Sequence, residues 1–265
     1  MHLEDYTAIK SVLGVLDSGV GGLSLLGDIR EHSPNHDIIY LADSRNIPYG
    51  DKPVDWICDR AISLCHKLIE MGAQLLIIAC NTITCNCISA IREKVAVPVI
   101  GIEPAIKPAA SMKLGNKTAV LGTVGTLKSA RVQQLADENS QGEFVFYPCV
   151  GLADEIEKGD LESAEVTQLA THYVSAAVTN GASVLVLGCT HYSLIKPLIQ
   201  ELAGSEVLII EPSRAVARQV VRRTTTVIDK RGKPASLSVF TNGDLLAMKN
   251  VLSRLNLPVS NISKI

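Results

Sequence analysis

Residues 75–109 read LLIIACNTITCNCISAIREKVAVPVIGIEPAIKPA, and residues 184–217 read VLVLGCTHYSLIKPLIQELAGSEVLIIEPSRAVA. Each segment opens with a short apolar run that ends at a cysteine, Cys80 or Cys189, and continues through a stretch of helical length. A second apolar run follows and ends in Ile-Glu-Pro; the glutamate comes 23 residues after the cysteine in the first segment and 22 in the second. The similarity predicts an internal repeat of two strand–helix–strand units.

Short apolar runs, each followed by a turn and a helical pattern, recur along the whole chain. They are continuous and do not alternate with polar residues, which is typical of strands in a parallel sheet that helices cover on both faces. We therefore expect an α/β fold of two similar, doubly wound parallel-sheet domains related by pseudo-twofold symmetry. The strands predicted outside the starts of the two repeat units are Ser11–Leu16, Asp37–Leu41, Val97–Ile102, Thr118–Leu121 and Val207–Ile210.

The repeat also predicts the limits of the domains. The first lobe should contain residues 1–103 and 213–265, and the second lobe residues 104–212. A helical stretch over 217–228 and a final strand over Ser236–Asn242 are expected to return to the first lobe. Because ligands bind at the carboxyl ends of the strands in such sheets, two facing lobes would bring both strand-end cysteines to one cleft, the predicted active site.

The composition excludes several classes of partner. The formal net charge is -2 and the Lys and Arg residues are scattered, so no basic surface for nucleic acid is expected. No apolar stretch has the length of a transmembrane helix, and the acidic N-terminal segment does not resemble a secretory signal. We therefore expect a cytoplasmic protein with no membrane partner.

The seven cysteines are expected to be free thiols, because the absence of a secretory signal indicates a reducing compartment. Cys85 and Cys87 form a C-x4-C-x-C pattern with Cys80, but this spacing matches no zinc or ferredoxin pattern. We expect both to fill space on a helix, as Cys58 and Cys65 should, and we predict no metal site.

Cys80 and Cys189 are each expected where a strand ends and a helix begins, a place where unpaired backbone N–H groups and the helix dipole favour negative charge. Such a place binds a carboxylate and lowers a thiol pKa from its ordinary value of about 8.5. Two opposed thiols suit a racemisation, in which one group removes the α-proton and the other delivers a proton to the opposite face. Asp17, at the end of the first strand, is expected to assist Cys80, and His191 to assist Cys189.

Two loops that contain glycine follow predicted strands. The loop over Asp17–Gly22 lacks the G-x-G-x-x-G spacing of a dinucleotide site. We interpret it as bringing backbone amides close to a small anion. Residues 122–126 are expected to serve similarly in the second lobe, with Thr123 at the substrate. No lysine stands in a recognisable pyridoxal-phosphate context, and no cofactor is expected.

Five motifs, LDSGVGGLS, IPYGDK, IACNT, GIEPA and LGCTHY, occur in the order and at the spacing typical of one family, from about residue 13 to residue 212. On these motifs the chain resembles the glutamate racemases. The resemblance implies a two-domain fold, a cofactor-independent reaction carried by two thiols, and glutamate as the small-molecule substrate. It also implies that the product, D-glutamate, is destined for peptidoglycan.

The resemblance further implies roles for single residues. Cys80 would take the α-proton from D-glutamate, and Cys189 would take it from L-glutamate. The residues that would contact the substrate or tune the thiols are Asp17, Ser18, Tyr49, Gly50, Asn81, Thr82, Thr190 and His191. Where many members of the family have Pro-Leu-Phe-Val-Pro-Leu-Val-Glu, this chain reads PCVGLADEIEKG, which leaves the role of Glu157 open.

Two other functions fit the same residues. An aspartate or hydantoin racemase would use the same pair of cysteines on another substrate. A non-catalytic protein that binds small anions would keep the two-lobed scaffold, but it would have no reason to keep both strand-end thiols. A homodimer is left open beside a monomer.

Overall fold

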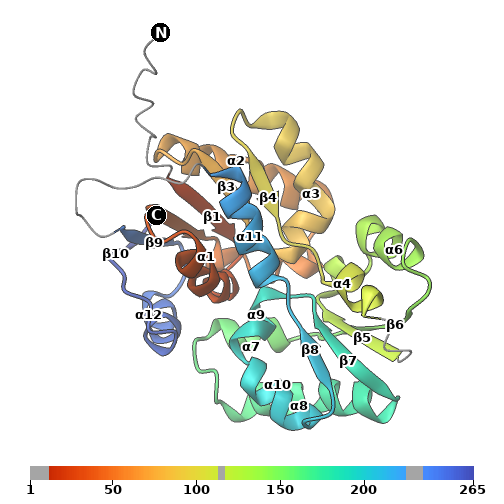
Figure 1. Ribbon diagram of the computed structural model, residues 1–265. Helices are drawn as coiled ribbons and strands as arrows, with labels where there is room; N and C mark the ends of the chain where they lie inside the picture. The colour runs from red at the N-terminus through yellow and green to blue at the C-terminus, as the bar shows by residue number, and fades with distance from the viewer. Residues whose placement is uncertain (1–11, 113–116, 225–234) are drawn as a thin grey trace.

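The computed structural model describes residues 12–112, 117–224 and 235–265, and its strands form two separate sheets (Figure 1). The larger sheet consists of β1 (Leu13–Asp17), β2 (Ile38–Ala42), β3 (Leu75–Ile78), β4 (Val99–Gly101), β9 (Leu237–Thr241) and β10 (Asn261–Lys264). The smaller sheet consists of β5 (Lys117–Gly122), β6 (Glu143–Pro148), β7 (Ala182–Leu187) and β8 (Leu208–Ile210). Every strand pair in both sheets is parallel.

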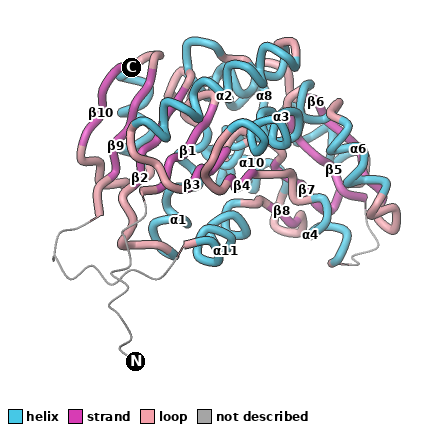
Figure 2. Tube along the Cα trace, turned by 90° about the horizontal axis from the view of Figure 1, so that it is seen from above, coloured by secondary structure: helices cyan, strands magenta, loops and turns pink. Residues whose placement is uncertain are grey.

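Helices lie against both faces of the sheets (Figure 2). In the described residues the α-helices are α1 (Leu26–His32), α2 (Val54–Glu70), α3 (Asn81–Lys94), α4 (Ile106–Ser111), α5 (Val124–Leu127), α6 (Ala130–Asp137), α7 (Leu152–Glu157), α8 (Ala164–Thr179), α9 (Thr190–Leu194), α10 (Lys196–Ala203), α11 (Ser213–Arg223) and α12 (Leu245–Arg254). Short 3-10 helices are η1 (Gly21–Leu25), η2 (Ser44–Asn46) and η3 (Tyr49–Asp51). None of the helices in these parts of the chain is long and apolar enough to cross a membrane.

Four strands of each sheet repeat the same arrangement. The first sheet has the order β10-β9-β2-β1-β3-β4 and the second the order β6-β5-β7-β8, so β1 to β4 correspond to β5 to β8. The repeated segments 75–109 and 184–217 contain β3 to β4 and most of β7 to β8. The α/β class, the doubly wound parallel sheets and the pseudo-twofold relation between them are confirmed, and β9 and β10 extend only the first sheet.

The burial of β1 explains why the strands read as continuous apolar runs. All five of its residues are buried. Leu13 and Val15 pack with the apolar side chains of α1 and α11 on one face of the sheet, whereas Leu16 packs with those of α2 and α3 on the other. A strand covered on both faces has no solvent side, so polar residues do not alternate along it.

The chain after β8 returns to the first sheet, as predicted. Helix α11 packs against α1, and β9 pairs with β2. The strand predicted over Ser236–Asn242 is confirmed as β9. Residues 225–228 of the helix predicted over 217–228 lie outside the described residues, as does Ser11. The limits of the lobes at 103/104 and 212/213 stay a prediction.

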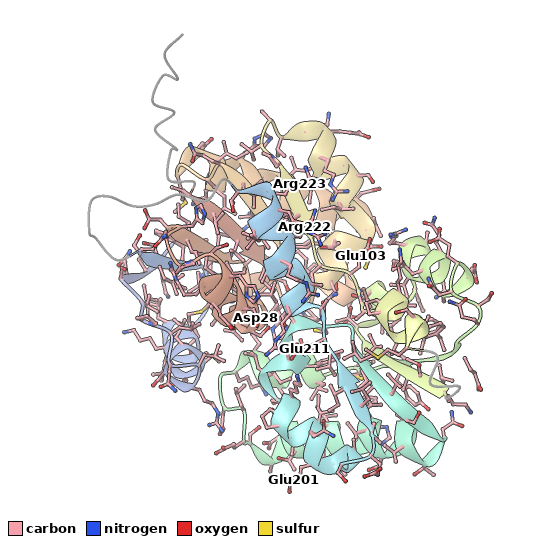
Figure 3. All side chains as sticks on the ribbon, viewed as in Figure 1. Asp28, Glu103, Glu201, Glu211, Arg222 and Arg223 are labelled. Carbon is pink, nitrogen blue, oxygen red and sulfur yellow. A yellow bond between two sulfur atoms is a disulfide. The ribbon has the colours of Figure 1, made fainter. Side chains whose placement is uncertain are left out.

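The two glutamates of the repeated Ile-Glu-Pro lie where the chain crosses between the sheets (Figure 3). Glu103 follows β4 and accepts a hydrogen bond from Arg131 Nε at 2.7 Å. Glu211 follows β8 and accepts one from Lys196 Nζ at 2.5 Å. Each crossing is therefore tied to a cation of the second lobe, which gives the repeated glutamates a structural role.

One prediction from the sequence is wrong, because two of the seven cysteines are not free. Cys58 in α2 and Cys87 in α3 form a disulfide with their Cα atoms 5.1 Å apart. The other five cysteines are free and buried. The helical pattern indicated that both residues lie on helix faces, but not that α2 and α3 pack side by side with these faces together. Such a pairing depends on tertiary packing, and the residues next to each cysteine in the sequence do not indicate it.

The disulfide predicts a thiol count and a loss of stability. Denatured without reductant, the protein should expose five reactive thiols, and after reduction seven. The double variant C58A/C87A should have a free energy of unfolding lower by about 2–4 kcal/mol, because its unfolded chain lacks a cross-link over 29 residues. Urea unfolding measures this difference, and reduced wild type should match the variant. Seven reactive thiols before reduction would contradict the bond.

Candidate active site

The two strand-end cysteines occupy matching places in the two sheets. Cys80 comes two residues after β3 and caps the start of α3, and Cys189 comes two residues after β7 and caps the start of α9. The carbonyl of Cys80 accepts a hydrogen bond from Thr84 N at 2.9 Å, and that of Cys189 accepts one from Tyr192 N at 3.1 Å. Both cysteines are buried. Their expected position between a strand and a helix N-terminus is confirmed.

A small cavity of about 20 Å³ is lined by both cysteines. Its wall includes every residue that the sequence analysis named for the site except Asp17. The lining residues are Ser18, Ile47, Pro48, Tyr49, Gly50, Cys80, Asn81, Thr82, Thr123, Ala153, Cys189, Thr190 and His191. Ile47, Pro48 and Ala153 were not predicted, because apolar wall residues carry no chemical signal in a sequence.

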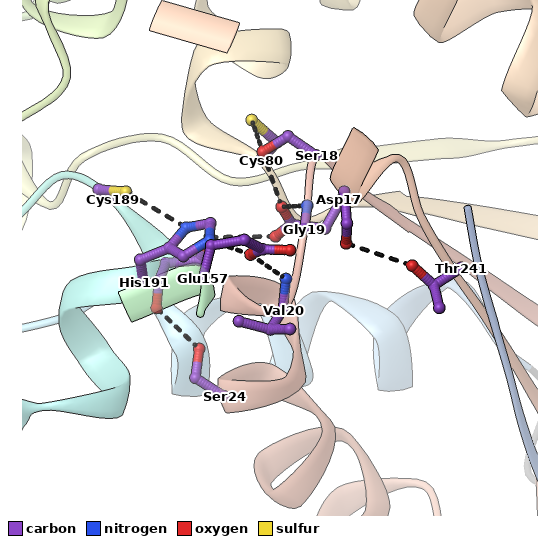
Figure 4. A network of polar contacts seen from close by, with 12 residues as sticks. Asp17, Ser18, Gly19, Val20, Ser24, Cys80, Glu157, Cys189, His191 and Thr241 are labelled. Carbon is purple, nitrogen blue, oxygen red and sulfur yellow. Dashed lines mark hydrogen bonds and ion pairs between the residues drawn. The ribbon is translucent and has the colours of Figure 1, made fainter. Parts of the chain in front are cut away.

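Ser18 connects Cys80 to Asp17 (Figure 4). Its Oγ lies 3.5 Å from Cys80 Sγ and 3.1 Å from Asp17 Oδ1. Burial raises the pKa of the Cys80 thiol to about 12, and the Asp17 carboxylate adds to this rise. Cys80 is therefore held as a protonated thiol. Asp17 acts on it through Ser18 and through its charge, with no direct hydrogen bond to Cys80 in the part of the chain that the structure describes.

Asp17 joins the two lobes next to the cavity. Its Oδ1 accepts a hydrogen bond from Gly19 N at 3.0 Å, and its Oδ2 accepts one from Thr190 Oγ1 at 3.0 Å. Complete burial raises the pKa of Asp17, although the charge of His191 opposes the rise. A carboxylate of the first lobe thus holds the start of the helix that follows Cys189.

A chain of contacts runs from Cys189 through His191 to Glu157 (Figure 4). Cys189 Sγ lies 3.8 Å from His191 Nδ1, and His191 Nε2 lies 2.8 Å from Glu157 Oε2. Burial alone would lower the pKa of His191, but its hydrogen bonds with Cys189 and Glu157 raise it well above the usual value. His191 is therefore positively charged at neutral pH, and this charge lies beside Cys189.

Glu157 is the residue whose role the sequence left open. Besides contacting His191, its Oε2 accepts a hydrogen bond from Val20 N at 2.8 Å. One carboxylate thus joins α7 and α9 of the second lobe to the glycine-rich loop of the first. Glu157 and His191 are 34 residues apart in the chain. Only the packing of α7 against α9 shows that they meet.

The glycine-rich loop after β1 allows the lobes to approach closely. A Cβ on Gly21 would come within 2.5 Å of His191 Nδ1, and a Cβ on Gly19 would collide with Glu157. Two of the loop amides, however, do not serve as the sequence suggested. The N–H of Gly19 is donated to Asp17, and the next N–H is donated to Glu157. These two amides bind protein carboxylates and are not free for a small anion.

Three hydroxyls meet where α3 of the first lobe touches the second lobe. Thr82 Oγ1 lies 3.0 Å from both Thr123 Oγ1 and Thr126 Oγ1, which are 2.9 Å from each other. Gly50 packs closely here, since a Cβ on it would lie 2.8 Å from Thr123 Cβ. The second predicted loop therefore contributes to the cavity through the side chain of Thr123.

Asn81 and Tyr49 differ in the atoms that they leave for a ligand. Asn81 Nδ2 donates a hydrogen bond to Ile102 O at 3.3 Å, while its buried Oδ1 has no partner among the described residues. Because a buried oxygen without a partner is costly, a donor on a bound molecule is the group that would satisfy it. Tyr49 donates its hydroxyl to Asp43 at 2.6 Å, so only its ring and backbone remain for the cavity.

Comparison with known proteins finds relatives over most of the chain. Residues 25–220 match the Asp/Glu/Hydantoin racemase family. A glutamate racemase from Ralstonia pickettii is 38% identical over 251 residues, which cover 94% of this chain and 89% of that protein. A solved glutamate racemase isoform from Bacillus anthracis has a TM-score of 0.83 at 28% identity, with 96% and 97% of the two chains covered. The glutamate racemase of Francisella tularensis, solved in complex with D-glutamate, has a TM-score of 0.79 at 28% identity, with 97% of each chain covered.

The contact between Glu157 and His191 predicts a pH effect. Because the folded-state pKa of His191 is raised, its protonated form stabilises the fold below pH about 6.5, and this stabilisation is lost as the pH rises through the raised pKa. Replacing Glu157 by Gln removes a negative charge and should lower the pKa of His191, which an NMR titration of the imidazole nitrogens measures. The control is E155Q on the same helix, because Glu155 pairs with Lys158 at the surface. An unchanged His191 pKa in E157Q would rule out this electrostatic coupling.

Proposed function

Because the chain belongs to the Asp/Glu/Hydantoin racemase family, we propose that it interconverts L- and D-glutamate without a cofactor, with Cys80 and Cys189 as the two proton-transfer groups. Membership of the family makes the protein an amino-acid racemase, an isomerase. The observation that carries the two-thiol proposal is that cysteines on corresponding strand ends line the same cavity. Glutamate is favoured as the substrate because the relatives are glutamate racemases and one of them was solved with D-glutamate.

The surroundings of the two thiols support a direction for each. In the resting site burial raises the pKa of Cys80 to about 12 and keeps it protonated, whereas Cys189 Sγ lies 3.8 Å from the charged imidazole of His191. With L-glutamate bound, Cys189 removes the α-proton and Cys80 delivers its proton to the opposite face, which yields D-glutamate. The reverse reaction starts from the exchanged proton state, with Cys80 as the base and Cys189 as the acid.

The polar lining is proposed to hold the charged groups of glutamate. Asn81 Oδ1 lacks a donor and would accept a hydrogen bond from the α-ammonium group. The groups proposed for the two carboxylates are the hydroxyls of Ser18, Thr82 and Thr123 and the backbone of Tyr49 and Gly50. Because a thiolate is a weak base for an α-proton, this preorganised surround must supply most of the stabilisation of the developing carbanion.

We assign the moving parts of the enzyme to two lobes, residues 1–103 with 213–265 and residues 104–212. The hydrogen bonds that join them across the site include those from Thr190 Oγ1 to Asp17, from Val20 N to Glu157, and between the hydroxyls of Thr82 and Thr123. Opening of the cleft to admit glutamate would break these bonds. Their return over the bound substrate would exclude water from the carbanion and restore the charges around both thiols.

The resemblance to the glutamate racemases also suggests where the product goes. We propose that D-glutamate made here supplies peptidoglycan synthesis and that the enzyme works in the cytoplasm, where the disulfide between Cys58 and Cys87 must resist reduction. Mirror-image amino acids have equal free energies, so racemisation alone stops at equal amounts of both. A biosynthetic step that consumes D-glutamate would draw the reaction in one direction.

Replacing either cysteine should abolish racemisation but leave exchange of the α-hydrogen in one enantiomer. C80A and C189A should each lose at least about 10²–10⁴-fold in racemisation rate, since one face of the substrate then has no proton-transfer group. In deuterated water, C80A should still exchange the α-hydrogen of L-glutamate, and C189A that of D-glutamate, because one thiol remains. Polarimetry follows racemisation, and proton NMR follows exchange. The control is C65A, a buried cysteine outside the cavity, and wild-type activity in C80A or C189A would refute the mechanism.

The wild-type protein should racemise glutamate with no added cofactor and leave aspartate unchanged. This expectation follows from the relatives, which are glutamate racemases. Racemisation of aspartate without that of glutamate would assign the alternative substrate. Glutamate binding with no exchange of the α-hydrogen would assign a non-catalytic anion-binding protein.

A further inference from the structure

The carboxylate of Asp43, which lies outside the cavity, gathers hydrogen bonds from three segments of the chain. Asp43 follows β2 and is completely buried. Its Oδ1 accepts hydrogen bonds from Arg60 Nη2 at 2.6 Å and from Asn242 Nδ2 at 2.5 Å. Its Oδ2 accepts from Arg60 Nε at 2.9 Å, Tyr49 Oη at 2.6 Å and Asn46 Nδ2 at 2.9 Å. One side chain thus ties together α2, the segment after β2 and the loop after β9.

Arg60 is the partner that allows Asp43 to stay charged. Burial alone would raise the pKa of Asp43, but hydrogen bonds from Arg60, Tyr49 and Asn46 outweigh burial and lower this pKa below its usual value. The guanidinium of Arg60 binds both carboxylate oxygens as a fork, the strongest geometry for such a pair. Without it, Asp43 would be a buried charge without a counterion, and Tyr49 would lose its charged acceptor.

Tyr49 connects this network to the cavity. Residues 47–50 line one side of the cavity, and the hydroxyl of Tyr49 is fixed on Asp43. The same segment packs against the second lobe, since a Cβ on Gly125 would lie 2.7 Å from Gly50 O. The segment 47–50 is therefore held between Asp43 on one side and the second lobe on the other.

Asn242 brings in a part of the chain beyond residues 25–220, which match the family. Its Nδ2 donates to Asp43, and its Oδ1 accepts a hydrogen bond from Arg45 N at 2.9 Å. One amide therefore holds both the start of the segment that leads into the cavity wall and the carboxylate that anchors it. The loop after β9 reaches the site in this way without contributing a lining residue.

We propose that Arg60 and Asn242 are positioning residues of the racemase, which hold Asp43 and, through Tyr49, set the place of the cavity wall formed by residues 47–50. The inference rests on the proposed function, because glutamate is the substrate that this wall would contact. The wall touches substrate and transition state alike. Its displacement therefore weakens the binding of both enantiomers more than it slows the chemical step.

The test compares R60Q and N242A with a matched control, R30Q. Arg30 makes a similar bridge at the opposite ends of β2 and β9, where its guanidinium donates to His36 O and Ser236 O. R60Q and N242A should raise KM for L- and D-glutamate by about tenfold, the effect of roughly one lost hydrogen bond, with a smaller fall in kcat. R30Q should keep the wild-type KM and kcat.

Two further variants test the route through Tyr49. Y49F removes only the hydroxyl bonded to Asp43 and should reproduce the rise in KM seen for R60Q. The double variant Y49F/R60Q should bind substrate about as weakly as either single variant, because both changes break the same connection. R60K keeps the charge but loses the two-armed geometry, so it should recover part of the affinity.

Thermal unfolding is measured for every variant, and kinetics are compared at temperatures well below the unfolding midpoints. N242A removes a smaller side chain than R60Q changes, so it remains informative if R60Q does not fold. The proposal is wrong if R60Q or N242A loses stability as R30Q does but keeps the wild-type KM. It is also wrong if the effects of Y49F and R60Q multiply. A wild-type protein that does not racemise glutamate would reject the proposed function and this inference with it, a result distinct from the other two.

Discussion

The structure depends on burying charged groups where the two lobes meet. Asp17 and His191 are buried and Glu157 is largely so, and both carboxylates accept a hydrogen bond from the opposite lobe. Because a buried charge that loses its partner costs several kcal/mol, the closed arrangement of the lobes and the charged state of the site support each other. Glycines at positions 19 and 21 make this possible, since a side chain at either place would keep the lobes apart.

Most of the fold could be predicted because the strands of a parallel sheet have a simple hydrophobic pattern in the sequence. Runs such as Leu75–Ile78 are buried on both faces, so every residue in them is apolar, and the repeat predicted β5, β7 and β8 of the second sheet from the first. The edge strand Asn261–Lys264 could not be found in this way, because it is partly exposed and carries polar residues. The pairing of Cys58 with Cys87 was missed for a different reason, since it depends on how two helices pack and not on the pattern of either.

The residues of the site also fall into two groups, those that the sequence pattern indicates and those that only tertiary packing brings together. Cysteines at the ends of apolar runs, with an aspartate and a histidine beside them, have a chemical signature that spacing alone reveals. Glu157 and Asp43 act through contacts with residues far away in the chain, and an acidic residue on a helix or after a strand is ordinarily explained by solvation. Tyr49, which the resemblance implies as a substrate contact, lines the cavity, and only the structure shows that its hydroxyl is already bonded to Asp43.

The two halves of the fold are alike, but the two halves of the site are not. Cys80 contacts a neutral Ser18 and lies near the carboxylate of Asp17, whose charge favours a protonated thiol, whereas Cys189 contacts the cation of His191. In the proposed reaction this difference cannot favour one product at equilibrium, because the enantiomers have equal free energies and kcat/KM must be the same in both directions. The difference between the surroundings of the two thiols instead decides which enantiomer finds the free enzyme with the thiol on its side ready to accept the α-proton. Similar lobes thus supply opposed faces, and their different neighbours supply the difference of one proton that a two-base reaction requires.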